Sequence, residues 1–462
     1  MEARAMEHPY FLGIGGIGMS ALAFHYLRQG CRVAGYDRAC TPLTRRLEEA
    51  GAEIHYSERP DLIPSRTDCV IYTPAIPSTH AEWGEIRRRG LPVYKRAELL
   101  GILSRRYKTL AVAGTHGKTT TSVLLAYLLH GSVGCNAILG GLSPDLGGNY
   151  LHHETSPFLV TEADEYDRSF LQLHPYFSAV TAWDADHLDI YGTLENMRAA
   201  YVQFMRQSEH FIAEAALELP VPCDYRYASA PVPAGKGKGP MAYASRVEVR
   251  EGMYRFTYTG PKAVIKDLGL PCPGRHNIEN AVAAISLALE AGAAPGDIQR
   301  LLPDFKGVNR RLECRYRTSE LVYIDDYAHH PAEITASLRA LREFYPDYRM
   351  EVYFQPHLYS RTRDLAKGFA SALQKADRLC LIDIYPAREL PIPGVDTRLI
   401  GDSVEGIPVL YLAKEEMLED IRKRLQKRCA DRNKLLLVSM GAGDIDTLVG
   451  DISQLCRKGG QG

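Results

Sequence analysis

The stretch from Leu110 to Ser122 constrains this chain more than any other, and it reads Leu-Ala-Val-Ala-Gly-Thr-His-Gly-Lys-Thr-Thr-Thr-Ser. Four apolar residues predict a buried strand, an apolar run from Ser122 to Leu129 predicts a helix, and the glycines between them predict a loop. Backbone N–H groups in such a loop, together with the positive end of the helix dipole, bind phosphate oxygens. Lys118 is placed to reach the terminal phosphates of a nucleotide, and the Thr119 hydroxyl is placed to hold Mg²⁺.

The loop lacks one glycine of the usual phosphate-loop pattern, because Val112 stands where that glycine is expected. The pattern that remains is Gly114-x-x-Gly117-Lys118-Thr119. An ordinary glycine-rich turn between a strand and a helix is the alternative. The order glycine, lysine, threonine at this point favours a nucleoside triphosphate site.

The composition limits the classes to which this chain can belong. Its 462 residues correspond to about three domains, and 45% hydrophobic with 24% charged residues is typical of a globular protein with real cores. A formal net charge of −1 gives no electrostatic reason to bind nucleic acid or an anionic membrane. The ten cysteines contain no Cys-x-x-Cys pair, and we find neither a signal peptide nor an apolar run of about 20 residues, so we expect a cytoplasmic protein with reduced thiols.

A second glycine loop lies near the start of the chain. Residues 10–12 predict a strand, Gly13-Ile-Gly-Gly-Ile-Gly18 a tight turn, and residues 19–27 a helix. Asp37 closes the next predicted strand, about where an acid binds the ribose in dinucleotide-binding folds. The motif alone suggests NAD or FAD, but a helix N-terminus with close backbone approach suits any pyrophosphate, including that of a nucleotide-sugar. A structural turn in a parallel sheet is the remaining alternative.

The rest of the first segment fits an open parallel sheet. Residues 69–72 predict a strand that runs into Thr73-Pro-Ala-Ile-Pro77, and open α/β sheets bind their ligands at such carboxyl ends. The polar run at residues 105–108 sets the boundary of the first domain near residue 107.

Two predicted strands of the central segment end in acidic clusters. Residues 158–161 run into Glu162-Ala-Asp-Glu-Tyr-Asp167, and residues 179–183 run into Asp184-Ala-Asp-His-Leu-Asp189. Parallel strands end at one edge of a sheet, where the phosphate loop also leaves its strand, and carboxylates there hold Mg²⁺ against nucleotide phosphates. Glu162 and His187 are our candidate ligands; solvated carboxylates and a structural histidine are the alternative. The other acids, Asp164, Glu165, Asp186 and Asp189, are expected to support the ligands or to face solvent.

The remaining sequence predicts one more polar helix start and a third α/β segment. The helix over residues 281–291 begins with more polar residues than capping requires, among them Asn277 and Asn280. Arg310 and Arg311 either reach phosphates or are solvated, and residues 231–240 predict a flexible loop. Residues 321–324, 352–354, 379–384 and 435–438 predict strands with polar loops behind them, which indicates a doubly wound parallel sheet.

Seven spaced motifs make the chain similar to the Mur ligases of peptidoglycan synthesis. They are Gly13-Ile-Gly-Gly-Ile-Gly-Met-Ser20, Gly114-Thr-His-Gly-Lys-Thr-Thr120, Glu162-Ala-Asp-Glu165, Asp184-Ala-Asp-His187, His276-Asn277, Gly307-Val-Asn-Arg-Arg311 and Asp325-Asp-Tyr-Ala-His-His-Pro331. The resemblance implies an α/β protein of three domains: a Rossmann-like UDP-binding domain over 1–107, a P-loop ATPase domain with a mostly parallel sheet over 108–306, and a Rossmann-like C-terminal domain that binds the amino acid over 307–462.

The resemblance also implies an ATP-dependent ligase with Mg²⁺, in which the lactyl carboxylate of UDP-N-acetylmuramate attacks ATP and the amine of L-alanine attacks the acyl phosphate. Lys118, Glu162 and His187 would be catalytic, and Thr119, Glu162 and His187 would hold metal. The implied nucleotide contacts are Gly114, Thr115, His116, Gly117, Lys118, Thr119, Thr120, Asn280, Arg310 and Asp326. The implied substrate contacts are Gly15, Gly16, Ile17, Gly18, Asp37, Thr73, Pro74 and Ala75 for the UDP part, and Tyr327, His329 and Arg361 for alanine. We expect a monomer or a weak homodimer.

Two departures and three rival functions remain. Many such ligases have arginine where Leu358 follows the Gln-Pro-His motif, and Tyr201 stands near the place where sister ligases carry a modified lysine, so we expect no such modification. A member of the family that adds a ready-made tripeptide is the first rival, and the loop at residues 15–20 argues against it. An NAD-dependent oxidoreductase and a non-catalytic nucleotide sensor are the others.

Overall fold

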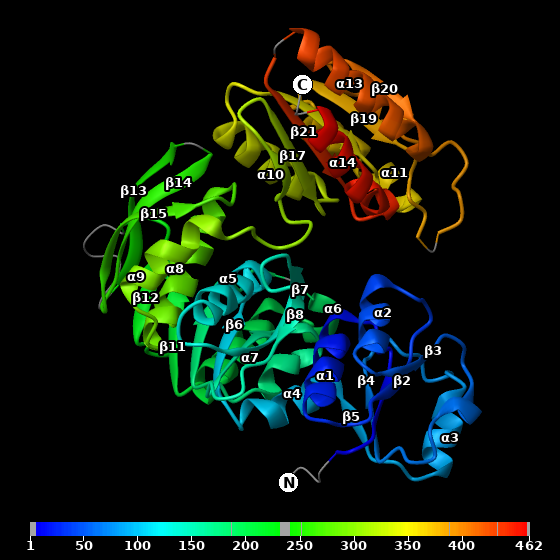
Figure 1. Ribbon diagram of the computed structural model, residues 1–462, viewed down its shortest axis with the longest axis vertical. Coiled ribbons are helices and arrows are strands. Elements are labelled where there is room, and N and C mark those ends of the chain that lie inside the picture. Colours follow the sequence, from blue (N-terminus) through cyan, green and yellow to red (C-terminus); the bar gives the residue numbers. More distant parts are fainter. Residues whose placement is uncertain are drawn as a thin grey trace. The chain divides into compact units, whose positions relative to one another are not determined.

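The computed structural model describes residues 6–185, 187–231, 241–250, 252–387, 389–431 and 433–459 (Figure 1). Asp186 and most of the loop predicted at 231–240 lie outside these ranges. By its internal contacts the chain divides into two compact units. The first consists of Met1–Ser245, Thr257–Asp267 and Glu279–Leu302, and the second of Arg246–Phe256, Leu268–Ile278 and Pro303–Gly462. Three mostly parallel sheets confirm the predicted fold class, whereas the exact domain boundaries near 107 and 306 stay a prediction.

The first sheet is open and parallel, with the order β3-β2-β1-β4-β5. Its elements are β1 (Pro9–Leu12), α1 (Ile17–Arg28), β2 (Ala34–Tyr36), α2 (Pro42–Glu49), β3 (Glu53–His55), β4 (Cys69–Tyr72), α3 (Glu82–Arg88), β5 (Val93–Lys95) and α4 (Arg96–Ser104). The strand order reverses between β1 and β4, and such a switch point is where open α/β sheets bind ligands. The first glycine loop follows β1 and the Thr73 turn follows β4, so the fold places both at the switch point.

The second sheet has the order β15-β14-β13-β12-β11-β10-β6-β9-β7-β8. Its strands are β6 (Lys108–Ala113), β7 (Asn136–Ser143), β8 (Gly148–Leu151), β9 (Phe158–Ala163), β10 (Phe177–Val180), β11 (His210–Glu214), β12 (Tyr225–Ala228), β13 (Met241–Arg250), β14 (Met253–Thr259) and β15 (Val264–Leu270). Its helices are α5 (Lys118–His130), the short 3-10 helix η2 (Tyr166–Gln172), α6 (Leu188–Tyr191), α7 (Leu194–Gln207), α8 (Arg275–Glu290) and α9 (Pro295–Leu301).

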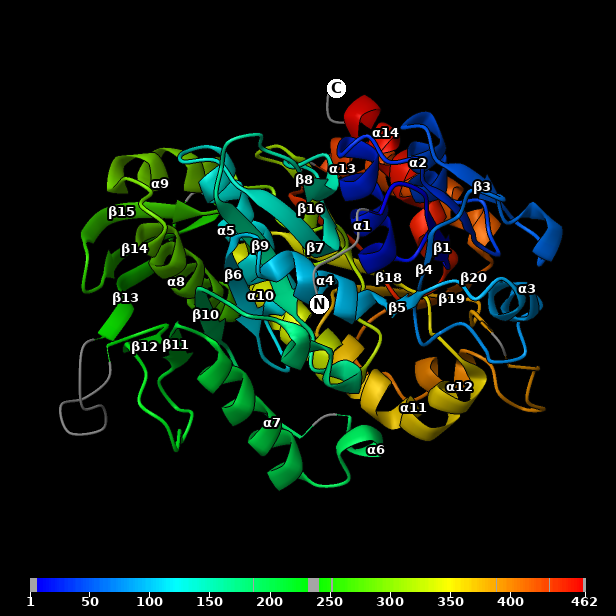
Figure 2. The same ribbon diagram turned by 90° about the horizontal axis from the view of Figure 1, so that it is seen from below.

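The phosphate-loop strand β6 lies between the two acid-bearing strands and is parallel to both. Helix α5 packs over β6, β7 and β9, as Figure 2 shows. The prediction that both acidic clusters end at the edge of the phosphate loop is therefore confirmed. Strand β10 ends at Val180, before the predicted residue 183. There Thr181 turns its hydroxyl to the carbonyl oxygens of Ala113, at 3.1 Å, and of His116, so the chain follows the phosphate loop rather than a neighbouring strand.

The third sheet has the order β16-β17-β21-β18-β19-β20, and all pairs except β16 with β17 are parallel. Its elements are β16 (Glu313–Arg317), β17 (Leu321–Asp326), α10 (Pro331–Phe344), β18 (Arg349–Phe354), α11 (Tyr359–Leu373), β19 (Arg378–Ile382), α12 (Arg398–Gly401), β20 (Val409–Leu412), α13 (Met417–Asp431), β21 (Leu435–Met440) and α14 (Val449–Gly459). The four predicted strands are present. The edge strands β16 and β20 were missed, because β16 is polar and β20 is only half-buried and so lacks the apolar run of an inner strand.

Buried side chains on one face of the third sheet form a core with α13 and α14, including Tyr323, Tyr353, Met417 and Ile452. Successive residues of a strand point to opposite faces of the sheet. Both faces of this sheet carry buried apolar side chains, as is required when helices cover both of them. Among the described helices, none combines the length and the apolar character needed to cross a membrane.

Candidate functional site

Lys118 is the first residue of α5, and its ammonium group is held by a buried carboxylate. Its Nζ donates to Glu165 Oε1 at 2.9 Å, to Glu165 Oε2 at 2.8 Å and to the Gly114 carbonyl at 2.6 Å. The Glu165 side chain is 1% exposed and that of Lys118 is 17% exposed. A buried carboxylate needs such a partner, because an unpaired charge in the interior is strongly destabilising. Glu165 was expected to support a ligand or to face solvent; solvent exposure is excluded, and its partner is the loop lysine.

Two positions of the phosphate loop accept only glycine. Gly117 has φ +80°, and a Cβ there would lie 2.5 Å from Asn280 Oδ1. Gly114 has φ +140°, and a Cβ there would lie 2.0 Å from the Thr181 hydroxyl oxygen. Asn280, predicted to contact the nucleotide, therefore lies directly against the loop although it comes from α8. Both glycines give the backbone a close approach that a side chain would block.

The hydroxyl of Thr119 and the carboxylate of Glu162 form the pair predicted to hold Mg²⁺. Thr119 Oγ1 donates to Glu162 Oε2 at 3.2 Å, and Ser122 Oγ donates to Glu162 Oε1 at 3.3 Å. The backbone N–H of Gly140 also donates to Glu162 Oε1, at 2.9 Å. Two oxygen donors beside a phosphate loop fit Mg²⁺, which usually completes its shell with substrate phosphates and water. Within the described residues, no three His, Cys, Asp or Glu side chains form a closed metal site.

His187 lies beside Glu165 instead. Its Nε2 is 4.0 Å from Glu165 Oε1, and its ring meets the Tyr166 ring edge-on at 5.2 Å. The backbone of His187 has φ +50°, an uncommon conformation for a residue other than glycine and one often found at functional sites. The side-chain contacts of the neighbouring Asp189 lie outside the described residues. The role of His187 as a ligand of a second metal stays a prediction.

The other phosphate-loop residues connect the loop to the end of β10. Thr115 Oγ1 accepts from the backbone N–H of Asp184 at 3.2 Å. His116 Nε2 is 3.6 Å from Asp184 Oδ2, in an exposed pair. Thr120 is half-buried in the first turn of α5. The structure thus gathers all seven predicted loop residues in one turn, and the second acidic cluster contributes through Asp184.

The carboxylate of Asp37 is hydrogen-bonded to the backbone of the first glycine loop. Its Oδ2 accepts from the backbone N–H of Gly15 at 2.8 Å, and its Oδ1 accepts from that of Ala39 at 3.2 Å. Gly13 has φ +82°, and a Cβ there would lie 3.2 Å from the Thr73 methyl group. The turn that follows β4, with Pro74 and Ala75, therefore adjoins this loop as predicted. Gly16 precedes α1 in an extended conformation with no side-chain cap among the described residues.

A cavity of about 380 Å³ connects the surroundings of the two glycine loops within the first unit. Its walls contain Gly18 of the first loop, Lys118 and Glu162 of the second site, Asp164 of the first acidic cluster, and Arg96, which no motif indicated. Arg96 Nη2 is 3.5 Å from Asp164 Oδ2. The only sequence signal for Arg96 is a cation at the carboxyl end of a short strand, which is too common to be recognised alone.

In the second unit, Asp326 and Arg310 come together at the carboxyl end of β17. Asp326 is buried, and its oxygens accept from the Ser337 hydroxyl at 2.5 Å and from the Leu312 N–H at 3.3 Å. Burial raises the pKa of Asp326 from 3.8 to about 6, while the bond from Ser337 opposes that change. The Arg310 guanidinium lies 5.0 Å above the Tyr327 ring and 3.1 Å from Asp446 Oδ2.

The residues predicted for the amino acid also lie in the second unit. His329 meets Tyr327 edge-on at 5.3 Å and His357 at 6.2 Å between ring centroids. Arg361 Nη1 is buried without a hydrogen-bond partner among the described residues. Burial and the nearby Arg361 lower the pKa of His357. Leu358, the departure from the expected arginine, is the residue before α11 and has φ +73°, a strained backbone for a branched residue.

Models of three domains of one family match the sequence. The Mur ligase family catalytic domain matches residues 8–108, the Mur ligase middle domain residues 112–288, and the Mur ligase glutamate ligase domain residues 310–443. The chain belongs to the Mur ligase family. Together the three matches cover the two glycine loops, both acidic clusters and the Asp325–Pro331 motif.

Relatives of this Mur ligase are similar over its full length. The UDP-N-acetylmuramate–L-alanine ligase of Phocaeicola vulgatus is 42% identical over 99% of this chain and 100% of its own, and that of Flavobacterium johnsoniae is 40% identical over 99% and 100%. A crystal structure of the UDP-N-acetylmuramate–alanine ligase of Thermotoga maritima superposes with a TM-score of 0.80 at 28% identity, covering 98% of this chain and 99% of that one. A murein peptide ligase of Psychrobacter arcticus, 21% identical with a TM-score of 0.63 over 98% of each chain, shares the fold.

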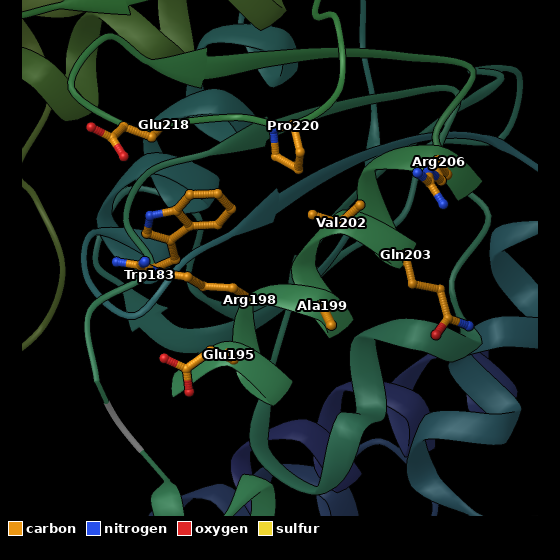
Figure 3. A pocket seen from close by; sticks show the side chains of 9 residues that line it. All are labelled: Trp183, Glu195, Arg198, Ala199, Val202, Gln203, Arg206, Glu218 and Pro220. Atoms are coloured by element: carbon orange, nitrogen blue, oxygen red, sulfur yellow. The ribbon is translucent and has the colours of Figure 1, made fainter. Parts of the chain in front are cut away.

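The Mur ligase also has a wider cavity that contains none of the predicted site residues. Its volume is about 680 Å³, and Figure 3 shows it between α7 and the chain that connects β11 to β12. Trp183 forms one wall, with the Arg198 guanidinium 5.4 Å from its ring centre. Tyr201, at the place considered for a modified lysine, lies on α7 but is fully buried, with its ring edge-on to that of Phe170.

Proposed function

We propose that this chain is an ATP-dependent ligase that joins L-alanine to the lactyl carboxylate of UDP-N-acetylmuramate, through an acyl phosphate, in the synthesis of peptidoglycan precursors. The observation that carries the proposal is similarity over 99% of the chain to curated ligases of that name, at 40–42% identity. The proposed reaction also needs a phosphate loop with a lysine that can follow moving charge, and Lys118 is such a residue. A cytoplasmic location and a monomer or weak homodimer extend this proposal and stay predictions.

The first unit carries the phosphate chemistry in this proposal. Lys118 would release Glu165 and turn to the β- and γ-phosphates of ATP, where its charge stabilises the transferring group. Thr119 and Glu162 would hold Mg²⁺, which supplies positive charge to the phosphates when bound. Glu165 orients Lys118, because both oxygens of the Glu165 carboxylate accept hydrogen bonds from the Lys118 ammonium group. Gly114, Gly117 and the other loop residues would cradle the phosphates with their backbone.

The second unit carries the residues that we propose for the amino acid and for part of the nucleotide. Arg361 has a buried donor without a partner among the described residues, which suits the carboxylate of an amino acid. His357, whose pKa is lowered in part by Arg361, is in ring contact with His329, which in turn contacts Tyr327, and these side chains would shape the pocket. Arg310 and Asp326 remain our proposed nucleotide contacts.

A ligase that adds a tripeptide to the same nucleotide-sugar is the second candidate, because a murein peptide ligase shares this fold. At 21% identity that likeness extends to the fold alone, whereas the named alanine ligases match at about twice the identity. The alanine-adding reaction is therefore the favoured proposal.

The test is a coupled assay of phosphate release with ATP, Mg²⁺ and UDP-N-acetylmuramate. One reaction receives L-alanine, and the other receives the L-alanyl-γ-glutamyl-diaminopimelate tripeptide. We expect phosphate release only with alanine, and a product with the mass of UDP-N-acetylmuramoyl-L-alanine. Release only with the tripeptide would transfer the chain to the second candidate, and no release in either reaction would remove the ligase proposal.

A further inference from the structure

We propose that Arg96 is a substrate-binding residue of this ligase and that its guanidinium binds the diphosphate of the nucleotide-sugar at the first turn of α1. The inference rests on the proposed function, because it assumes that a UDP-sugar occupies the first glycine loop. It adds a cation from a different helix to a site whose motif contains only glycines and an acid.

The position of Arg96 is fixed relative to the first glycine loop. A Cβ at Gly18, in the first turn of α1, would lie 2.9 Å from both Cδ and Nη1 of Arg96. The guanidinium therefore occupies the space that any other residue at position 18 would fill. A side chain at position 18 would therefore have to displace the end of the Arg96 side chain, which comes from α4. A phosphate at the N-terminus of α1 would have a full positive charge next to the helix dipole.

The start of α4 is tied down from two sides. Lys95 precedes it, with its N–H donating to Glu98 Oε2 at 2.7 Å and its Nζ donating to Asp167 Oδ2 at 3.1 Å. Asp164 accepts the Tyr166 N–H at 3.1 Å with one oxygen and faces Arg96 with the other. Asp164 and Asp167 lie on either side of Tyr166, the first residue of η2. Their contacts with Arg96 and Lys95 therefore hold the guanidinium in one position. Preorganisation of this kind reduces the entropy lost on binding.

Of the two cations that line the cavity, Arg96 is the one beside the first glycine loop and therefore the one we assign to a diphosphate. Among the described residues that line the cavity, the cations are Arg96 and Lys118, and the anions are Glu162 and Asp164. Lys118 is bound by Glu165 and the Gly114 carbonyl, next to the other glycine loop. The contact between Arg96 and Asp164, at 3.5 Å, is longer than a good charge-assisted hydrogen bond. A guanidinium has five donors in a planar fork, so it can keep this contact and still bind phosphate oxygens with two parallel bonds.

The experiment compares Arg96→Gln and Arg96→Lys with the wild-type chain. Calorimetry measures the dissociation constant of UDP-N-acetylmuramate, and competition measures that of UDP, which shares the diphosphate but lacks the sugar and its carboxylate. We expect Arg96→Gln to weaken both ligands by the same factor, about 10- to 100-fold, as expected for loss of a charged hydrogen-bonding partner. Arg96→Lys keeps the charge but not the fork, so we expect a smaller loss. The affinity for ATP should change less than twofold.

Arg88→Gln is the matched control, because Arg88 is an exposed arginine of α3 whose ion pair is with Glu85 in the same helix, at 2.6 Å. It should bind both ligands as the wild type does. If Arg96→Gln does not fold, Asp164→Asn tests the same idea, since it frees the guanidinium and should change the affinity for both ligands by several-fold with an unaltered unfolding temperature.

Two outcomes would overturn the inference. Unchanged affinities in Arg96→Gln and Arg96→Lys would show that the guanidinium does not contact the ligand. Weaker binding of UDP-N-acetylmuramate with unchanged binding of UDP would assign Arg96 to the carboxylate instead. A different result would refute the proposed function. If the wild-type chain binds the nucleotide-sugar but releases no phosphate with alanine, the ligase reaction is refuted, and the binding constants of the Arg96 variants can still be compared.

Discussion

The loop that follows β1 and the loop that follows β6 both turn a buried strand into the first turn of a helix through glycines with positive φ, +82° at Gly13 and +80° at Gly117. Their charges differ. In the first loop a carboxylate, Asp37, accepts a backbone N–H, and the nearby cation belongs to α4. In the second loop the cation is Lys118, the first residue of the helix itself, and a buried carboxylate holds it.

In the proposed function this difference matches two tasks. A loop that only binds a diphosphate benefits from a fixed cation that a neighbouring helix holds in place. A loop in which phosphate is transferred needs a flexible cation that can follow charge as it moves, and a lysine on a long side chain is suited to that. The glycines therefore give both loops the same kind of backbone turn. In this proposal, the element that supplies the cation distinguishes a loop that binds a diphosphate from one at which phosphate is transferred.

The largest effect is expected from Lys118→Ala, which removes the cation of the phosphate loop. Phosphate release should fall by at least about 100-fold, because one donor to a charged transition state is lost. Binding of UDP-N-acetylmuramate, at the other loop, should change less than threefold. Lys262→Ala serves as the control, since Lys262 is a surface lysine paired with Glu290. The comparison breaks if Lys118→Ala keeps more than a tenth of the activity.

Glu162→Gln sharpens the assignment of the second loop as the metal site. The amide keeps the bond from the Gly140 N–H but loses the charge that Mg²⁺ prefers. We expect the Mg²⁺ concentration for half-maximal activity to rise about tenfold, in line with the loss of one metal ligand. Glu154→Gln, an exposed acid of the same segment, should leave the Mg²⁺ titration unaltered. An identical titration for both variants would show that Glu162 does not hold the metal.

Gly117→Ala tests whether Gly117 is needed only for the backbone turn of the loop or also for the close approach of Asn280 on α8. Both Gly117 and Gly30 have φ +80°, but nothing lies within 4 Å of a Cβ at Gly30, whereas Asn280 Oδ1 would be 2.5 Å away at Gly117. Backbone strain alone should destabilise each variant by about 1 kcal/mol. Gly117→Ala should also raise the KM for ATP several-fold, because Asn280 must move. Equal KM values for ATP in the two variants would remove Asn280 from the site.

The smallest effect concerns the sheet under the first loop, where Glu82 is buried and accepts from the Tyr10 hydroxyl at 2.6 Å. Burial raises the pKa of Glu82 from 4.5 to about 7. A raised pKa means that the folded state binds the proton more tightly, so the stabilisation is complete below pH 4.5 and is lost as the pH rises through about 7. The loss is roughly 3 kcal/mol, at about 1.4 kcal/mol for each unit of pKa.

Glu82→Gln should therefore flatten the fall in unfolding temperature between pH 5 and pH 8, measured by calorimetry. Glu85→Gln is the control on the same helix, since Glu85 is paired with Arg88, which lowers its pKa. It should retain the wild-type pH dependence. The same fall in unfolding temperature from pH 5 to pH 8 in the wild type and in Glu82→Gln would contradict the assignment.

Much of the fold could be predicted because its units are local. The units of strand, glycine loop and helix in the first two sheets show their pattern within about 20 residues, so β4, β6 and β9 were found with small errors at their ends, whereas β3, β11 and β12 were missed. Strand ends were less certain, because the ladder of β10 stops where Thr181 bonds to the phosphate loop. Edge strands such as β16 lack the apolar pattern that makes an inner strand recognisable.

By itself the sequence determined the two glycine loops, the acids that follow β9 and β10, and the resemblance to a family, because all of these are short patterns of adjacent residues. Tertiary structure decided which groups meet. The order of β10, β6 and β9 places Glu165 on Lys118, and the packing of α4 on α1 places Arg96 over Gly18. Neither contact has a signature in the sequence, because burial and side-chain distance depend on how separate segments pack and not on the residues beside each one.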